Sequence, residues 1–211
     1  MEVSVSEAAQ MLGVSPGRLR ALIHAGRVQA RRVADRWLVE ATSLPPALHR
    51  TRPMAPHVAW EFLADNIPAH YAPDQAYRWR TRRARLADDH EPERLLASWV
   101  ASRADRRWFA TRDDDEMLTD PRLVLSGCCD PRAQISAAGL VEAYVTGHDL
   151  DAVRHTYLLR PGGVHDNVVL HVTDVLPPTP VPLLLVAADL ADHGGDREAA
   201  RARALIAEAL T

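Results

Sequence analysis

The chain has 211 residues, a length that allows one large domain or two small ones. Its hydrophobic fraction of 47% and charged fraction of 25% are those of a folded globular protein and exclude a disordered chain. The longest apolar run, residues 183–188, is too short to cross a bilayer, which takes about 20 residues. Because the N-terminus also lacks a basic leader before an apolar run, we expect a cytoplasmic protein with no membrane contact.

Charge is distributed unevenly along the chain. All 25 lysine-or-arginine positions hold arginine, which is typical of a GC-rich genome. Residues 1–52 carry eight arginines and four acids (net +4), residues 53–112 carry ten and eight (+2), and residues 113–211 carry seven and sixteen (−9). The basic N-terminal part suits a polyanion such as DNA, whereas the acidic C-terminal part predicts a different kind of partner.

The first residues predict a short helix. Ser6 is expected to cap it, because a serine hydroxyl accepts a hydrogen bond from a free amide of the first turn. Ala8, Ala9 and Leu12 then form one apolar stripe. Gly13 is expected to end the helix, as glycine commonly does just after the last turn.

A second helix is predicted over residues 16–25. Ser15 occupies the cap position, and Pro16 stands in the first turn, where the missing amide hydrogen of proline costs nothing. The positions expected to face inward, at i, i+3 and i+4, are Leu19, Leu22 and Ile23. The opposite side carries small and basic residues and is therefore open to a partner.

After Gly26 the hydrophobic period changes from 3.6 to 2. Residues 28–33 and 36–39 predict two short strands joined by residues 34–35, with Trp37 covering the core beneath them. This hairpin forms a two-stranded wing with several arginines on it or beside it.

The order helix, turn, helix and hairpin resembles the winged helix-turn-helix of the excisionase and MerR-like DNA-binding families. The matching segments are residues 6–9 (SEAA), 12–15 (LGVS), 28–33 (VQARRV) and 36–39 (RWLV). In those families the second helix enters the major groove, where an arginine can read guanine. The wing contacts the neighbouring DNA backbone, where arginines can hold phosphates. The residues expected to contact DNA are Ser15, Gly17, Arg18, Arg20, Arg27, Arg31, Arg32 and Arg36. The alternative is a solvated face of a protein-binding winged helix.

The middle of the chain is marked by prolines. Residues 43–56 contain four of them and predict a linker, because proline interrupts helices and central strands. Three helices follow, over residues 56–66, over residues 73–87 and from Pro92 onward, each opened by a proline. One helix face carries Arg78, Arg82 and Arg85 within reach of Asp74, Asp88 and Asp89. We interpret this row as a salt-bridged surface rather than a second DNA contact.

From residue 107 strands and helices alternate. Strands are expected at residues 107–111, 122–126, 140–146 and 167–173, helices at 149–157 and 196–210, and a buried apolar segment at 183–187. The acidic run 113–116 is interpreted as a helix start, where the macrodipole favours negative charge. A divalent-cation site is the alternative for this run.

Sequence motifs of catalysis are missing from this region. We find no G-x-S-x-G, no Walker lysine, no H-E-x-x-H and no dinucleotide fingerprint. The adjacent Cys128 and Cys129 cannot form a disulfide framework and are a poor start for a zinc site, and their role stays open. We therefore expect no enzymatic activity, no cofactor and no metal.

The C-terminal region has the element order of a known family. Its segments 122–127 (RLVLSG), 139–145 (GLVEAYV), 149–153 (DLDAV), 167–172 (NVVLHV) and 187–191 (AADLA), followed by an Arg/Ala helix, are similar to the abortive-infection (AbiEi) antitoxin family of bacterial repressors. That resemblance implies repression of its own operon and protection against a nucleotidyltransferase toxin encoded beside it. It assigns no role to any single residue, and operator geometry is not implied, because the N-terminal part looks more like an excisionase wing.

The sequence thus predicts an α+β protein with a winged helix-turn-helix at residues 1–42, a linker at 43–56, a helical segment at 57–106 and an α/β antitoxin-like domain at 107–211. The predicted function is a repressor that binds a double-stranded DNA operator as a homodimer and counteracts a cognate toxin. The alternatives are an excisionase-like architectural factor, which the long acidic remainder makes less suitable, and an enzyme with a DNA-binding head.

Overall fold

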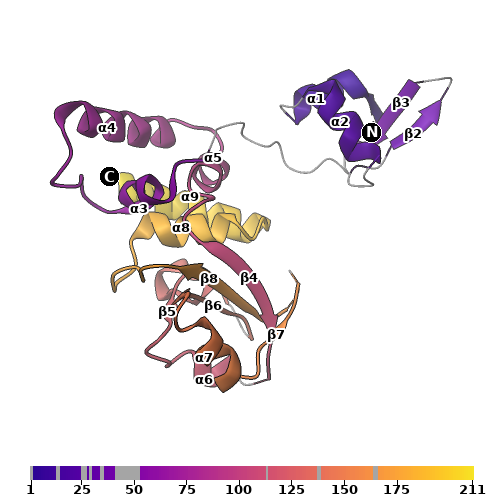
Figure 1. Ribbon diagram of the computed structural model, residues 1–211. Coiled ribbons are helices and arrows are strands. Elements are labelled where there is room, and N and C mark those ends of the chain that lie inside the picture. The colour runs from indigo at the N-terminus through magenta and orange to yellow at the C-terminus, as the bar shows by residue number, and fades with distance from the viewer. Residues whose placement is uncertain are drawn as a thin grey trace. The chain divides into compact units, whose positions relative to one another are not determined.

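The computed structural model describes residues 2–12, 15–24, 28, 30–33, 36–40, 53–112, 114–136, 139–163 and 166–211. The chain forms two compact units, Met1–Thr51 (the head) and Arg52–Thr211 (the second unit). Both units contain helices, and both contain a sheet, so the predicted α+β class is confirmed (Figure 1). Among the described residues, no helix is long and apolar enough to cross a membrane.

The described residues of the head form two helices and a small antiparallel sheet. Its elements are β1 (Glu2–Ser4), α1 (Val5–Met11), α2 (Pro16–His24), β2 (Ala30–Val33) and β3 (Arg36–Glu40). The predicted helices and hairpin are present, and the strand order is β1-β3-β2. The sequence analysis did not predict β1, which pairs with β3 through Val3 and Val39.

Apolar side chains of both helices form the core of the head. Ala8, Ala9 and Leu12 of the first stripe are buried, as are Leu19 and Ile23. The predicted place of Trp37 is also confirmed, because its side chain packs against this core. The His24 ring lies edge-on to the Trp37 ring, with 6.0 Å between the ring centroids.

The start of α1 differs from the prediction. The helix begins at Val5, one residue before the expected cap Ser6. Its cap is Ser4, whose Oγ accepts from the amide of Glu7 at 3.2 Å, while Glu7 Oε2 accepts from the amide of Ser4 at 2.8 Å. This reciprocal pair is a capping box, and the sequence signal for it is a serine followed three residues later by glutamate.

Proline-started helices dominate the first half of the second unit. They are α3 (Pro56–Leu63), α4 (Pro73–Ala87) and α5 (Pro92–Trp99), and α4 has the predicted bounds. The first of them ends three residues earlier than predicted, because Ala64 leaves the helix in an extended conformation (φ −64°, ψ 147°). The remaining helices are α6 (Asp114–Met117), α7 (Leu150–Thr156), α8 (Leu183–Ala191) and α9 (Asp196–Leu210), with short 3-10 turns η2 (Gly127–Cys129) and η3 (Pro131–Ala133).

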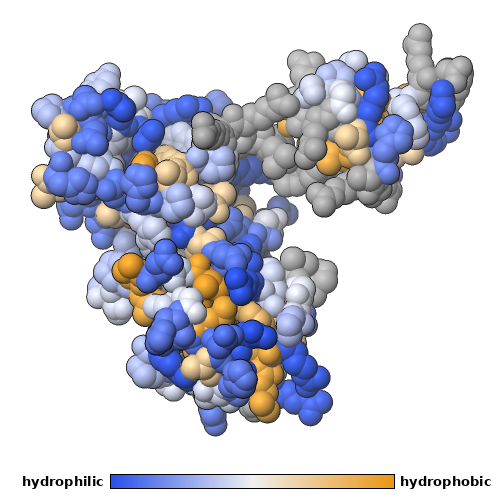
Figure 2. All heavy atoms as spheres, viewed as in Figure 1, coloured by the Kyte–Doolittle hydropathy of each residue, from blue (hydrophilic) through white to orange (hydrophobic). Residues whose placement is uncertain are grey.

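The surface of α4 agrees with its predicted ion pairing in part. Arg78 pairs with Asp74 at 2.5 Å, and both side chains are exposed. Arg85 instead places its guanidinium 5.5 Å from the ring centroid of Trp99. Hydrophilic residues cover α4 on the face shown in Figure 2.

A five-stranded mixed sheet forms the other half of the second unit. Its strands are β4 (Asp105–Ala110), β5 (Val124–Leu125), β6 (Val141–Thr146), β7 (Arg160–Pro161) and β8 (Val168–Thr173), in the order β5-β6-β8-β4-β7. The β6–β8 pair is parallel and all others are antiparallel. Strand β5 is shorter than the predicted 122–126, because Asp120 binds the backbone and side chain of Arg122 in a turn before it.

Two cores lie on the two faces of this sheet. Helices α6 and α7 cover one face, and α8, with α3, α5 and α9 beyond it, lies on the other (Figure 1). The helical segment at 57–106 and the region from 107 onward contribute to the same core, which contains Phe62, Trp99, Tyr144 and Leu185. The second unit is therefore held together across these two sequence regions.

Candidate nucleic-acid interface and a buried polar network

The first turns of α2 form an open surface. Ser15 and Arg20 are exposed, and a side chain added at Gly17 would meet nothing within 4 Å. The helix contains no acidic residue, and its inner face is fixed to the core by Leu19 and Ile23. The backbone of Arg18 lies in the same helix. An uncrowded, acid-free first turn is the part of a recognition helix that approaches base edges.

The wing presents basic side chains from the edge strand. Arg31 pairs with Leu38 and Arg32 with Trp37 in the β2–β3 ladder, and both arginines are exposed. Because successive strand residues point to opposite sides, Arg32 shares the side of Trp37 and Arg31 lies on the other. Arg36 begins β3 opposite Val33. The side chains of Arg18 and Arg36 and the whole of Arg27 lie outside the described residues. The other five predicted contacts, Ser15, Gly17, Arg20, Arg31 and Arg32, are all exposed.

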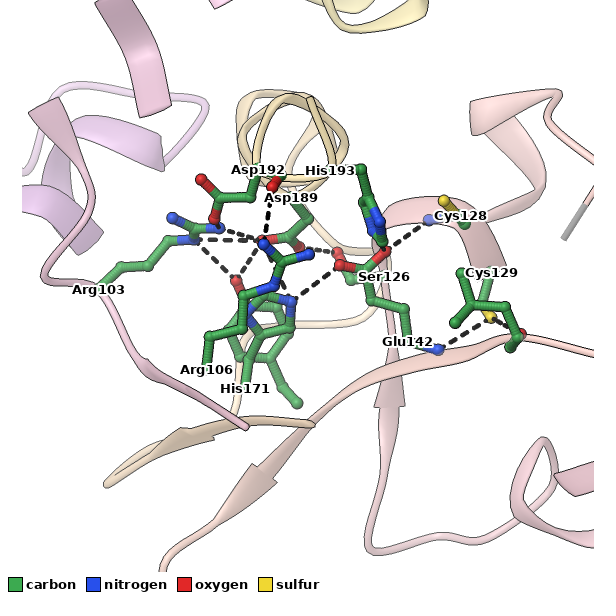
Figure 3. Close-up of polar contacts among 12 residues, drawn as sticks. Arg103, Arg106, Ser126, Cys128, Cys129, Glu142, His171, Asp189, Asp192 and His193 are labelled. Carbon is green, nitrogen blue, oxygen red and sulfur yellow. Dashed lines mark hydrogen bonds and ion pairs between the residues drawn. The ribbon is translucent and has the colours of Figure 1, made fainter. Parts of the chain in front are cut away.

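The second unit contains a buried network of polar side chains on the sheet face under α8, which the sequence analysis did not predict. Along β6, Glu142 and Tyr144 point to this face, while Val141, Ala143 and Val145 belong to the opposite core. In the neighbouring strands, His171 is the register partner of Tyr144, and Arg106 is the partner of His171. Figure 3 shows Glu142, His171 and Arg106 converging with residues of α8 and of η2.

An ion pair anchors α8 over this face. Arg103 Nη2 lies 2.7 Å from Asp189 Oδ1 and 2.6 Å from Asp192 Oδ2. Asp189 also accepts from the hydroxyls of Tyr144, at 2.7 Å, and Ser126, at 2.5 Å. Burial and the Asp189 carboxylate raise the pKa of Tyr144 far above its ordinary value, so this hydroxyl is a neutral donor.

Glu142 is the other buried acid of the network, and donors surround it. Its Oε1 accepts from His171 Nε2 at 3.0 Å, and its Oε2 accepts from His193 Nε2 and from the Cys128 amide, both at 2.9 Å. Burial works against the charged form of Glu142, but the hydrogen bonds from the two imidazoles prevail and hold its pKa well below the ordinary range. This carboxylate is therefore ionised inside the protein.

Glycine at position 127 creates the space for that carboxylate. Gly127 has a φ of +53°, and a Cβ added there would lie 1.8 Å from Glu142 Oε2. Any other residue would be strained and would displace the acid. The segment Ser126–Gly127–Cys128 is thus shaped around the Glu142 side chain.

The two cysteines have different surroundings. The Cys129 thiol donates to the Leu140 carbonyl at 3.2 Å and accepts from the Glu142 amide at 3.2 Å. Cys128 is buried beside the Glu142 side chain, and burial together with that charge raises its pKa to about 12. The sequence analysis noted both cysteines but did not connect them with Glu142, His171 or His193. A period-2 strand that alternates Val, Ala and Val with Glu and Tyr was the available signal.

Comparison with known proteins identifies the head. A family model described as "Helix-turn-helix domain" matches residues 2–44, which run from β1 to the end of β3 and slightly beyond. No curated protein and no solved structure matches the chain, so the similarity of the C-terminal region to abortive-infection antitoxins has no support from these comparisons. The chain therefore carries a DNA-binding helix-turn-helix domain at its N-terminus.

Proposed function

We propose that this protein is a sequence-specific transcriptional repressor and the autoregulating antitoxin of a toxin–antitoxin pair. The observation that carries the repressor part is the helix-turn-helix match over residues 2–44, on a head whose α2 and β2 leave Gly17, Arg20, Arg31 and Arg32 exposed. In this proposal α2 enters the major groove and reads base edges, while the wing arginines hold phosphates.

The second unit handles a protein partner in this proposal. Residues 113–211 have a net charge of −9, which repels DNA over most of that surface. A non-enzymatic role is supported by burial, because the side chains of Ser126, Glu142 and Asp189, which are of types used in catalysis, are 0% exposed. The sequence resemblance to antitoxins names the partner class, a nucleotidyltransferase toxin.

DNA binding is tested with the full-length protein and a fragment from upstream of its own gene. We expect affinity to fall with salt by about 0.9 log units per phosphate contact for each log unit of salt. Arg20→Ala should weaken operator binding, whereas Arg78→Ala, which removes an exposed arginine of α4, should leave it unchanged. An affinity that does not change with salt concentration, or that falls equally in Arg20→Ala and Arg78→Ala, would contradict the proposal. Stoichiometry in the same assay tests the expected homodimer on half-sites about one helical turn apart.

The antitoxin part is tested by growth. We expect the intact protein to protect cells from the product of the neighbouring gene, and the double variant Arg31→Ala/Arg32→Ala to lose repression but keep protection. If the intact protein represses its operon yet protects against no neighbouring gene product, the antitoxin part fails and the repressor remains.

A further inference from the structure

We propose that Cys128, Glu142 and His193 form a zinc site in the second unit. The three residues come from η2, from β6 and from the turn after α8. One ligand atom of each, a thiol sulfur, a carboxylate oxygen and an imidazole nitrogen, lies within 4.8 Å of the other two. Figure 3 shows the His193 ring and the Cys128 backbone on either side of the Glu142 carboxylate.

This ligand set suits Zn²⁺. Thiolate, imidazole and carboxylate are its usual protein ligands, at bond lengths of about 2.0–2.3 Å, which separates tetrahedral ligand atoms by ~3–4 Å. His193 Nε2 and Glu142 Oε2 are 2.9 Å apart, so a small outward movement of the His193 ring admits the ion. Three protein ligands leave the fourth position to water.

Charge and hydrogen bonding also fit a divalent cation. The carboxylate of Glu142 and the thiolate of Cys128 together balance two positive charges. On binding, the ion displaces the Cys128 thiol proton to solvent, and His193 ligates through Nε2 as a neutral imidazole that carries its hydrogen on Nδ1. His171 keeps its hydrogen bond to Oε1 and orients the ligating carboxylate from behind.

The surroundings of the three ligands fix the position of the Glu142 carboxylate and leave the site accessible from solvent beside His193. Gly127 leaves the room that the Glu142 carboxylate occupies, and the amide of Cys128 fixes that carboxylate toward η2. His193 is the least buried of the three, with 13% of its side chain exposed, and it lies edge-on to Trp108 with 6.1 Å between ring centroids. The ion therefore enters beside His193 and ties η2, β6 and the end of α8 together.

Cys129 provides a matched control. Its sulfur is next in sequence but is held by the Leu140 carbonyl and the Glu142 amide, and it does not belong to the cluster. A site built on Cys128 must distinguish the two cysteines, whereas adventitious thiol binding of zinc would not.

The test is zinc titration of metal-free, full-length protein by calorimetry, repeated with Co²⁺ as a spectroscopic probe. We expect one Zn²⁺ per chain, a thiolate-to-cobalt charge-transfer band with tetrahedral d–d bands, and a higher melting temperature with zinc. Cys128→Ser and His193→Gln should each weaken zinc binding by at least about tenfold and abolish the cobalt bands, whereas Cys129→Ser should bind as the parent protein does.

Circular dichroism of each variant separates ligand loss from misfolding. If Cys128→Ser does not fold, His193→Gln decides, because His193 is partly exposed and tolerates a polar replacement. Failure of the folded parent protein to bind Zn²⁺ overturns the site. Equal loss in Cys128→Ser and Cys129→Ser, or no loss in folded His193→Gln, also overturns it. Operator binding is measured separately, so these outcomes do not depend on the proposed repressor function.

Discussion

Arg103 and Asp189 form an ion pair inside the second unit, with 2.7 Å between Nη2 and Oδ1 and only 3% and 0% of their side chains exposed. Arg103 lies just before β4 and Asp189 lies in α8, so the pair connects the start of a strand with the helix above the sheet. Removing two charges from water costs about as much as their attraction returns. We infer that the pair's main effect is to fix α8 in one position over the polar face.

Loss of one partner should be severe. Asp189→Ala removes one of the two carboxylates paired with the buried Arg103, leaving Asp192, and it removes the acceptor of Tyr144 and Ser126. We expect the free energy of unfolding to fall by about 3–5 kcal/mol in urea titrations. The control is Asp74→Ala, which breaks the exposed pair with Arg78 and should cost less than about 1 kcal/mol. Similar losses for both variants would show that the buried pair has no special role.

Substitution of two serines tests which residue caps α1. Ser4→Ala removes the hydroxyl that accepts from Glu7 and should destabilise the head by about 1 kcal/mol. Ser6→Ala alters an exposed position inside the helix and should change its stability by less than about 0.5 kcal/mol. Hydrogen exchange of the α1 amides measures both effects. A larger loss of stability in Ser6→Ala than in Ser4→Ala would show that Ser6 is the cap, as expected from the sequence alone.

Asp120 should give the second unit an acid-sensitive component of stability. Hydrogen bonds from Arg122, opposed by burial and helped by Tyr157, lower the pKa of Asp120 from 3.8 to about 2. A depressed folded-state pKa stabilises the protein above pH 3.8, and this contribution of about 2 kcal/mol is lost as the pH falls toward 2. Asp120→Asn should therefore be less stable than the parent protein at pH 7 and nearly equal to it near pH 2. A stability difference that does not change between these pH values would contradict this assignment.

Gly17→Ala should have opposite effects on stability and on DNA binding. No atom lies within 4 Å of the added Cβ, and alanine is more favourable than glycine in a helix by up to about 0.5–1 kcal/mol. The melting temperature of the head should therefore rise slightly. If α2 approaches base edges as proposed, the same methyl group should weaken operator binding. Gly147→Ala, in an equally open position of the second unit, should not affect DNA binding. Unchanged affinity in Gly17→Ala would place the DNA contact elsewhere on the head.

Elements that depend on local signals could be predicted from the sequence. The bounds of α4 and α9 follow from Pro73 and from the Ala-rich amphipathic pattern after Gly195, because first-turn preferences and a 3.6-residue period are properties of neighbouring residues. Strands β1 and β7 were not predicted, since both are very short and depend on distant partners for their hydrogen bonds.

The buried polar network could not be predicted for a related reason. Alternation of Val141, Ala143 and Val145 with Glu142 and Tyr144 normally indicates a strand with one face in water. Here α8 covers that face, and its Asp189 lies two residues beyond the segment 183–187 that was interpreted as buried and apolar. Which helix covers which side of a sheet is a tertiary property, so the meeting of Glu142 with His193 becomes visible only in the folded structure.

The pairing of β4 with β8 has a consequence for the time course of folding. It joins residues 105–109 to residues 168–172, so the sheet of the second unit cannot close until most of that chain has left the ribosome. Strand pairings in the head span a shorter stretch of chain, from the β2–β3 hairpin to the pairing of Glu2 with Glu40. We predict that the head becomes protected first in pulse-labelling hydrogen exchange, before the amides of β4 and β8. Simultaneous protection would contradict this order. A nascent chain would then be able to bind DNA through its head before its second unit has folded.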